Sequence, residues 1–158
     1  MDPAITSLYG KRVRVRACGL CWKGDKLMLV NHVGLQRENF WAPPGGGVEF
    51  GESAQDTVIR EFEEETGMQV TAGRFLFVCE FINEPLHAVE LFFEVLHTSG
   101  NVVTGTDPEL PDNVSMISDA RWMSWAGIKT LPPAHVHGVF NRCNTPDELM
   151  HLNAYYRI

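Results

Sequence analysis

The stretch GGGVEFGESAQDTVIREFEEETGM, residues 45–68, decides how this chain is interpreted. It contains seven of the chain's twenty acidic residues, and four of these fall within its last eight positions. Ser53 is a suitable N-terminal cap and Gly67 a suitable C-terminal cap, so residues 53–66 are predicted to form a helix. A helix that gathers so many like charges needs a partner that neutralises them.

Helical spacing places Glu61, Glu64 and Glu65 in one patch, while Glu63 points away. The apolar stripe expected to face a sheet consists of Ala54, Val58, Ile59 and Phe62. The acidic patch borders this stripe, at the end of the helix where the dipole disfavours anions. A solvated acidic face is one interpretation. A divalent cation is the other, because Mg²⁺ in proteins is typically held by one or two carboxylates together with substrate phosphates.

Strand patterns flank this helix on both sides. The predicted strands are residues 11–22, 26–33, 40–42, 74–82, 88–97 and 120–125. Two further helices are predicted over residues 126–131 and 146–155. Residues 98–118 are expected to form a long functional or mobile loop, and the glycines at 45–47 are expected to end the short third strand. Hairpin connections with few helices indicate an α+β fold with a mixed sheet.

Composition narrows the class of protein. The 158 residues suit a single domain over positions 1–158. The net charge of −7 argues against a nucleic-acid polymer as partner. No apolar run is long enough for a membrane span and no secretory signal is evident, so we expect no membrane partner and a cytoplasmic location. The four cysteines are expected to be packed free thiols, because Cys18 and Cys21 would point to opposite faces of a strand.

A longer pattern runs through the acidic helix. Gly46, five residues, Glu52, seven residues and then REFEEETGM resembles the Nudix box, G-x5-E-x7-R-E-U-x-E-E-x-G-U, in which U is a bulky aliphatic residue. Every glycine and polar position matches, and Phe62 and Met68 fill the U positions. The similar region extends over about residues 11–131, with 132–158 as a C-terminal extension. The resemblance implies an α/β/α sandwich with a mixed central sheet.

The resemblance also implies an activity, namely hydrolysis of a nucleoside diphosphate linked to another group X, with Mg²⁺, or alternatively Mn²⁺, as cofactor. The implied metal ligands are the Gly45 carbonyl, Glu52, Glu61, Glu64 and Glu65. The implied catalytic residues are Arg60, Glu61, Glu64 and a further glutamate from later in the chain. Glu109 in the long loop is the candidate for it, and the alternatives on predicted strands are Glu80, Glu90 and Glu94. Arg60 would orient the carboxylates, and Glu61 acts as general base in parts of the family. A homodimer would also agree with the resemblance, with the tail after Pro133 as one contact.

Substrate recognition is expected from residues outside the box. Arg14 and Arg16 would meet phosphates if their strand lines the cleft, although a charged edge strand is the alternative. Phe40 would stack on a base, whereas Trp41 is expected to pack in the core. Pro85 follows the box at about the position that the family associates with ADP-ribose, which favours ADP-ribose or a nucleotide sugar. A housecleaning nucleoside triphosphate pyrophosphatase and a non-catalytic nucleotide sensor are the alternatives.

Overall fold

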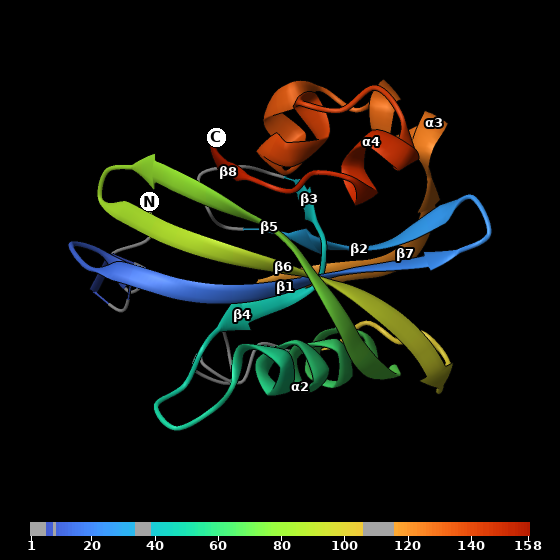
Figure 1. The fold of residues 1–158 in the computed structure, drawn as a ribbon, viewed down its shortest axis with the longest axis horizontal. Helices are drawn as coiled ribbons and strands as arrows, with labels where there is room; N and C mark the ends of the chain where they lie inside the picture. Colours follow the sequence, from blue (N-terminus) through green and yellow to red (C-terminus); the bar gives the residue numbers. More distant parts are fainter. Residues whose placement is uncertain (1–5, 8, 34–38, 106–115) are drawn as a thin grey trace.

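The computed structural model describes residues 6–7, 9–33, 39–105 and 116–158. The strands are β1 (Val13–Lys23), β2 (Lys26–His32), β3 (Phe40–Ala42), β4 (Gly45–Gly47), β5 (Gln69–Asn83), β6 (Leu86–Ser99), β7 (Ile117–Ser124) and β8 (Tyr155–Arg157). The helices are α2 (Ala54–Thr66), α3 (Trp125–Thr130) and α4 (Pro146–Met150), with 3₁₀ turns η1 (Pro133–His135) and η2 (Gly138–Asn141). Figure 1 shows α2 on one side of the sheet and α3 and α4 on the other.

The sheet is mixed, as predicted. Its strands follow the order β3-β2-β1-β6-β5-β8, with β4 paired to β1 and β7 paired to β2. The pairs β1–β6 and β5–β8 are parallel, and the remaining pairs are antiparallel. Because β1 pairs with β2 only near Trp22 and Lys23, the two strands diverge and β4 enters beside Arg16, Ala17 and Cys18. The α+β sandwich expected from the sequence is confirmed.

Helix α2 follows the prediction closely. The Ser53 hydroxyl accepts the backbone N–H of Asp56, and Gly67 ends the helix in the left-handed conformation, with φ of 68°. The prediction for Ile59 is wrong, since this side chain is 37% exposed. The buried arc of the helix is rotated toward Glu61 and Glu65, which are both buried within it rather than beside it. This rotation brings two carboxylates to the sheet.

Two apolar clusters fill the two faces of the sheet. On one face, Ala17, Cys21 and Met28 pack with Val58 and Phe62 of α2. On the other face, strand residues pack with the segment after α3, and the side chains involved include Cys18, Leu29, Ile128, Val139, Phe140 and Leu149. Cys18 and Cys21 therefore face opposite ways, as expected, and all four cysteines are buried and free. Trp41 also lies in the core, as predicted.

The segment 132–158 differs from the prediction. Helix α4 stops at Met150, where the backbone N–H of His151 closes the last turn, and the helix predicted to residue 155 is wrong beyond that point. Tyr155 and Tyr156 instead pair with β5 through Val78 and Cys79, because aromatic residues favour a pleated, half-buried position. The Tyr156 ring also contacts the Phe77 ring edge-on, at 6.3 Å between centroids. The tail therefore packs on its own sheet.

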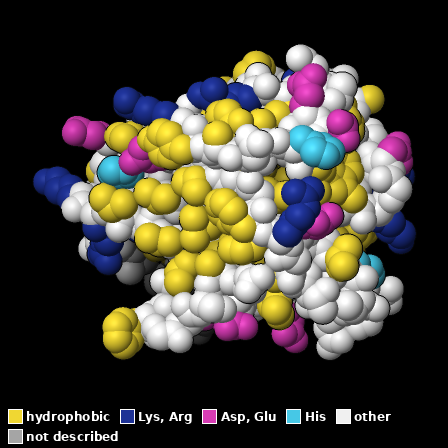
Figure 2. Space-filling view, viewed as in Figure 1, with side chains coloured by type: hydrophobic (Ala, Val, Ile, Leu, Met, Phe, Trp, Pro, Cys, Tyr) yellow, Lys and Arg dark blue, Asp and Glu magenta, His cyan; other side chains and the backbone are white. Residues whose placement is uncertain are grey.

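Strand β3 ends at Ala42, as predicted, but the glycines at 45–47 form a further strand, β4, which the sequence did not predict. Figure 2 shows hydrophobic side chains gathered over the sheet on the face viewed there. Large apolar side chains with substantial exposure on β1, β5 and β6 are Val13, Val15, Phe75, Ile82 and Leu96.

In the described part of the chain, no helix is long and apolar enough to cross a membrane.

Candidate active site

Strand β4 lies between α2 and β1 because its residues carry no side chains. A Cβ atom on Gly46 would come within 2.0 Å of Glu61 Oε1, and one on Gly45 within 2.4 Å of the Ala17 carbonyl oxygen. A side chain at Gly46 would displace the Glu61 carboxylate, and one at Gly45 would collide with β1. The glycines therefore allow the Glu61 carboxylate to reach past β4.

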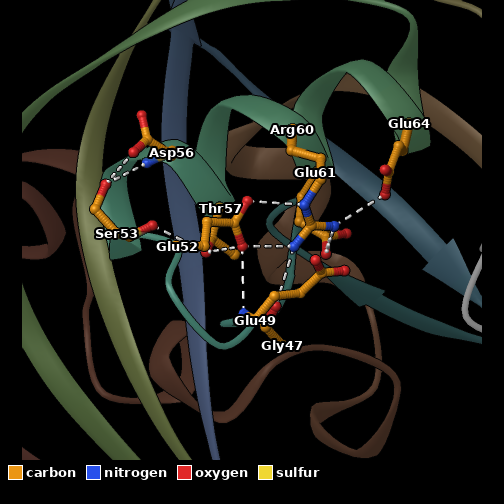
Figure 3. Close-up of polar contacts among 9 residues, drawn as sticks. All are labelled: Gly47, Glu49, Glu52, Ser53, Asp56, Thr57, Arg60, Glu61 and Glu64. Atoms are coloured by element: carbon orange, nitrogen blue, oxygen red, sulfur yellow. Dashed lines mark hydrogen bonds and ion pairs between the residues drawn. The ribbon is translucent and has the colours of Figure 1, made fainter.

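Arg60 connects the carboxylates of the box, as Figure 3 shows. Its Nε and Nη2 donate to the two oxygens of Glu52 at 2.9 and 3.0 Å, a bidentate pair. Its Nη1 donates to Glu61 Oε1 at 2.8 Å and to Glu64 Oε2 at 3.1 Å. Nη2 also donates to the Gly47 carbonyl at 3.1 Å. We call Glu52, Arg60, Glu61 and Glu64 the Arg60 cluster, and the predicted orienting contacts of Arg60 are present in it.

The carboxyl groups of Glu52 and Glu61 in this cluster differ in pKa. Hydrogen bonds from Arg60 lower the pKa of Glu52 to about 2, so Glu52 serves as the fixed anchor of the arginine. Burial raises the pKa of Glu61 to about 7, although Arg60 and Arg16 oppose the shift. A carboxyl group that titrates near neutral pH can accept and return a proton under ordinary conditions. The two residues therefore have different roles within one cluster.

Glu65 and Arg16 meet at Gly45 from opposite sides. The Gly45 N–H donates to Glu65 Oε2 at 3.0 Å, and Arg16 Nη2 donates to the Gly45 carbonyl at 2.8 Å. The carbonyl expected to bind a metal thus already accepts one hydrogen bond, and its role as a ligand stays a prediction. Gly45 thus links Glu65 of α2 to Arg16 of β1.

The donor chemistry suits a hard divalent cation. Within the described residues, no three His, Cys, Asp or Glu side chains form a ready-made metal site. However, Glu61 and Glu64 converge on a single cationic atom, Arg60 Nη1, and both offer carboxylate oxygens. Two converging carboxylates are what Mg²⁺ typically takes from a protein when phosphates complete its shell. The residues present therefore fit the implied ion.

A cavity of about 380 Å³ opens beside this cluster. Glu61 and Glu65 lie at its wall, as do the three residues predicted to bind substrate, Arg14, Arg16 and Phe40. The far wall comes from the C-terminal segment and includes Pro133, Ala134, Val136, His137, Gly138 and Ile158. Glu109 lies outside the described residues. The structure thus brings Gly45, Glu61 and Glu65 to one cavity with the predicted substrate contacts, and the segment after Pro133 helps to enclose it. The other predicted residues of the box, Glu52, Arg60 and Glu64, do not line this cavity.

Of the three strand glutamates considered from the sequence, Glu90 lines the cavity, together with His32 and His137, which were not predicted. Glu90 and His137, both buried, form a pair at 2.7 Å. Burial, followed by the charge of Arg16, lowers the pKa of His32 to about 4, which keeps its imidazole neutral. Alternation along residues 86–92 could have indicated that Glu90 faces the same side as Ala88 and Phe92, but no local signal marks His137.

The two other strand glutamates considered from the sequence are occupied elsewhere. Glu80 contacts His87 and Tyr155, and Glu94 contacts Arg74. Neither residue is among those lining the cavity. Pro85 lies in the turn between β5 and β6 and likewise does not line the cavity. Of these residues, none contacts the Arg60 cluster in the described part of the chain.

Comparison with known proteins agrees with this geometry. The sequence model of the NUDIX domain matches residues 10–140. The uncharacterized Nudix hydrolase YvcI of Bacillus subtilis is 41% identical over 58 residues, which are 37% of this chain and 35% of that protein. The RNA pyrophosphohydrolase of Bartonella clarridgeiae is 41% identical over 51 residues, 32% of this chain and 30% of that protein. The chain thus matches about a third of the length of these curated relatives.

Solved structures share the fold. A NUDIX hydrolase from Nitrosomonas europaea has a TM-score of 0.67 at 20% identity, over 80% of this chain and 81% of that chain. A UDP-X diphosphatase has a TM-score of 0.63 at 20% identity, over 99% of this chain and 75% of that chain. At this identity the likeness concerns the fold alone. The family assignment follows from the domain match, which spans most of the sequence and includes the whole box: the chain belongs to the Nudix family.

Proposed function

We propose that this chain hydrolyses the diphosphate linkage of a nucleoside diphosphate joined to a second group X, such as ADP-ribose or a nucleotide sugar. One observation carries the proposal. Glu61 belongs to the Arg60 cluster and also lines the cavity that contains Arg14 and Arg16. The cluster would thus meet a substrate whose phosphates lie along the arginines.

Divalent metal is part of the proposal. Bound Mg²⁺ or Mn²⁺ neutralises phosphate charge and lowers the pKa of an attacking water. The chain's own residues would have distinct tasks in this reaction. Glu61 and Glu64 would hold the ion with Glu65 beside them, Glu52 would anchor Arg60, and Arg60 would keep the carboxylates aligned.

Proton transfer is assigned to Glu61. Its carboxylate lies at the cavity wall, where it can take a proton from the attacking water. Its carboxylate is oriented by Arg60 Nη1 at 2.8 Å, so it needs no rearrangement to face the cavity. Glu109, which lies outside the described residues, remains a second candidate from the sequence.

The substrate is proposed to be a small molecule. Among similar proteins, one from Methanocaldococcus jannaschii is called an ADP-ribose pyrophosphatase, and that from Bartonella clarridgeiae an RNA pyrophosphohydrolase. The net charge of −7 favours the former kind of substrate, because RNA binding relies on surplus positive charge. A cavity walled by the C-terminal segment also favours a compact ligand.

Self-association is a further part of the proposal. The tail after Pro133 packs on its own sheet, and its role as a contact between two copies stays a prediction. Val13 and Val15 on β1 are 59% and 47% exposed and offer a second, apolar contact. We expect light scattering to give twice the chain mass if this contact forms, and a single chain mass if it does not.

A substrate panel tests the activity. Purified protein with Mg²⁺ or Mn²⁺ is incubated with ADP-ribose, nucleotide sugars, nucleoside triphosphates and RNA bearing a 5′-triphosphate, and the phosphate-containing products are identified. We expect cleavage of a nucleoside diphosphate derivative that falls by about a thousandfold in Glu64→Gln, since a positioned carboxylate typically contributes that much. Glu63→Gln, on the exposed side of the same helix, is the matched control and should keep the rate.

The same panel separates the alternatives. Cleavage of nucleoside triphosphates alone would indicate a housecleaning pyrophosphatase. Tight binding without turnover of any compound would indicate a sensor and would contradict the proposed hydrolysis.

A further inference from the structure

Arg16 enters the cavity with donors to spare. A guanidinium carries five N–H groups. Nη2 donates to the Gly45 carbonyl at 2.8 Å. Nε lies 3.3 Å from Glu90 Oε1, near enough for an ion pair, but its N–H is not directed along a hydrogen bond and has no acceptor within the described residues. The guanidinium is thus short of acceptors while lining a cavity.

Glu90 holds this arginine from the neighbouring strand. Arg16 and Glu90 are register partners in the parallel pair β1–β6, so their side chains leave the sheet side by side. Glu90 is buried, with a side chain only 9% exposed. Burial alone would raise the pKa of Glu90, but His137 and Arg16 outweigh it and lower the pKa to about 2. Glu90 is therefore a permanent anion beside Arg16.

His137 fixes Glu90 in turn. The Val139 backbone N–H donates to His137 Nδ1 at 3.3 Å, which leaves the ring proton on Nε2. Nε2–H then donates to Glu90 Oε2 at 2.7 Å, on the oxygen that Arg16 does not approach. The His137 backbone N–H donates to the Trp41 carbonyl at 2.8 Å, and its ring lies 5.4 Å from the Phe92 ring. The histidine is thus held on three sides.

The cavity is lined by Arg14, Arg16, Glu61, Glu65 and Glu90, so an anion would be recognised by the directed donors of Arg16 and not by a surplus of positive charge. A guanidinium held in one plane suits bidentate contact with phosphate oxygens. The fixed plane matters because an ordered donor loses less freedom when the ligand binds.

We propose that Glu90 and His137 are positioning residues that hold the Arg16 guanidinium in place for the diphosphate group of the ligand. This inference rests on the proposed function, which supplies a ligand with a diphosphate. It gives the C-terminal segment a role in recognition, because His137 follows η1 and reaches β6 across 47 positions of sequence. Neither residue touches the ligand in this account, since each acts through Arg16.

ADP in excess EDTA is the probe, because it carries a diphosphate and its binding needs no turnover. Isothermal titration calorimetry gives its dissociation constant for the wild type, Arg16→Ala, His137→Phe, His137→Gln and the double variant Arg16→Ala/His137→Phe. We expect Arg16→Ala and His137→Phe each to weaken binding by about 10-fold, the usual effect of losing a hydrogen bond to a charged group. His137→Gln retains an N–H donor toward Glu90 and should lie within about 3-fold of the wild type.

The double variant decides the question. If His137 acts through Arg16, adding His137→Phe to Arg16→Ala changes the dissociation constant by less than about 2-fold, because coupled residues are not additive. A full additional loss would overturn the inference, and so would a wild type that does not bind ADP at all. His151→Gln, an exposed histidine of the same segment, is the matched control and should bind as the wild type does.

Two further measurements separate loss of the fold and loss of turnover from loss of ADP binding. Thermal unfolding of each variant shows whether the fold persists, and if His137→Phe does not fold, Glu90→Gln replaces it in the same cycle. Turnover with Mg²⁺ is measured separately. Arg16-dependent ADP binding without turnover would contradict the proposed function and leave this inference standing. Turnover combined with additive losses of ADP binding in the double variant would support the proposed function and overturn this inference.

Discussion

Glu61 and Glu90 are almost equally buried, at 6% and 7% exposure, yet the pKa values of their carboxyl groups are shifted in opposite directions. The pKa of Glu61 is raised to about 7, whereas that of Glu90 is lowered to about 2. Glu61 shares the guanidinium of Arg60 with Glu52 and Glu64. Glu90 has Arg16 on one oxygen and His137 on the other.

Burial raises the pKa of both carboxyl groups, and only around Glu90 do the neighbouring cations and hydrogen-bond donors outweigh it. The Arg60 cluster has three carboxylates for one arginine and is short of positive charge. The Glu90 carboxylate, by contrast, has the cations Arg16 and Arg14 near it. A metal ion bound to a diphosphate would bring positive charge to the Arg60 cluster and phosphate oxygens to the donors of Arg16, which is why the two regions belong to one site in our proposal.

Gly46→Ala should disturb the Arg60 cluster most. Its Cβ would lie 2.0 Å from Glu61 Oε1, so the carboxylate must move away from Arg60 and the cavity. We expect kcat/KM for the substrate found in the panel to fall by about 100-fold or more, since a displacement of roughly 1 Å can cost that much. Gly127→Ala in α3 is the control and should keep the rate. A Gly46→Ala enzyme with unchanged kinetics would show that the position of Glu61 does not matter.

Glu61→Gln should stabilise the metal-free protein above pH 7. Because the pKa of Glu61 is raised to about 7 from 4.5, the folded state retains a proton that the unfolded state has lost between these values. Stability from this group is thus complete below pH 4.5 and is lost as pH rises to about 7. We expect a gain of up to about 3 kcal/mol for Glu61→Gln at pH 8, by denaturant unfolding in EDTA.

Glu90→Gln should act in the opposite direction. The pKa of Glu90 is lowered to about 2 from 4.5, so its contribution to stability is present above pH 4.5 and is lost as pH falls toward 2. We expect the variant to be less stable than the wild type by up to about 3 kcal/mol at pH 7, with the difference shrinking in acid. If Glu61→Gln and Glu90→Gln changed the unfolding free energy in the same direction just above pH 7, the contrast between the two regions would be refuted.

Ser53→Ala should have the smallest effect and leave both regions intact. Its hydroxyl caps α2 by accepting the Asp56 N–H at 3.1 Å. We expect a loss of about 1 kcal/mol in unfolding free energy, typical of a lost N-cap. The pH dependence assigned to Glu61 should not change. A changed pH profile would mean that the carboxyl charge depends on helix stability rather than on the neighbours of Glu61.

The two regions also differ in how well they can be predicted from the sequence. The Arg60 cluster lies within residues 52–64, so caps and helical spacing alone predict the helix and the shared carboxylate patch. Sequence spacing did not predict that Glu61 and Glu65 are buried, because the rotation of α2 is set by packing against the glycines of β4. The strand β4 was itself missed, since three glycines carry no strand signal.

The region around Arg16 is assembled from distant segments. Alternation in β1 indicates that Arg14 and Arg16 share a face, and both line the cavity as expected. The contact between Glu90 and His137 joins positions 47 residues apart, and no local sequence pattern indicates such a contact. The same holds for β8, whose pairing with β5 depends on tertiary packing of the tail. Local charge and spacing were informative here, whereas long-range pairing was not.

The central claim is that the divalent ion binds at the Arg60 cluster and not at Glu90. Titration of Mn²⁺, followed by electron paramagnetic resonance of the free ion, measures this directly in the wild type, Glu61→Gln, Glu63→Gln and Glu90→Gln. We predict that Glu61→Gln weakens Mn²⁺ binding by at least about 10-fold, while the other two stay within about 2-fold of the wild type. Wild-type affinity in Glu61→Gln, or a loss confined to Glu90→Gln, would contradict the account.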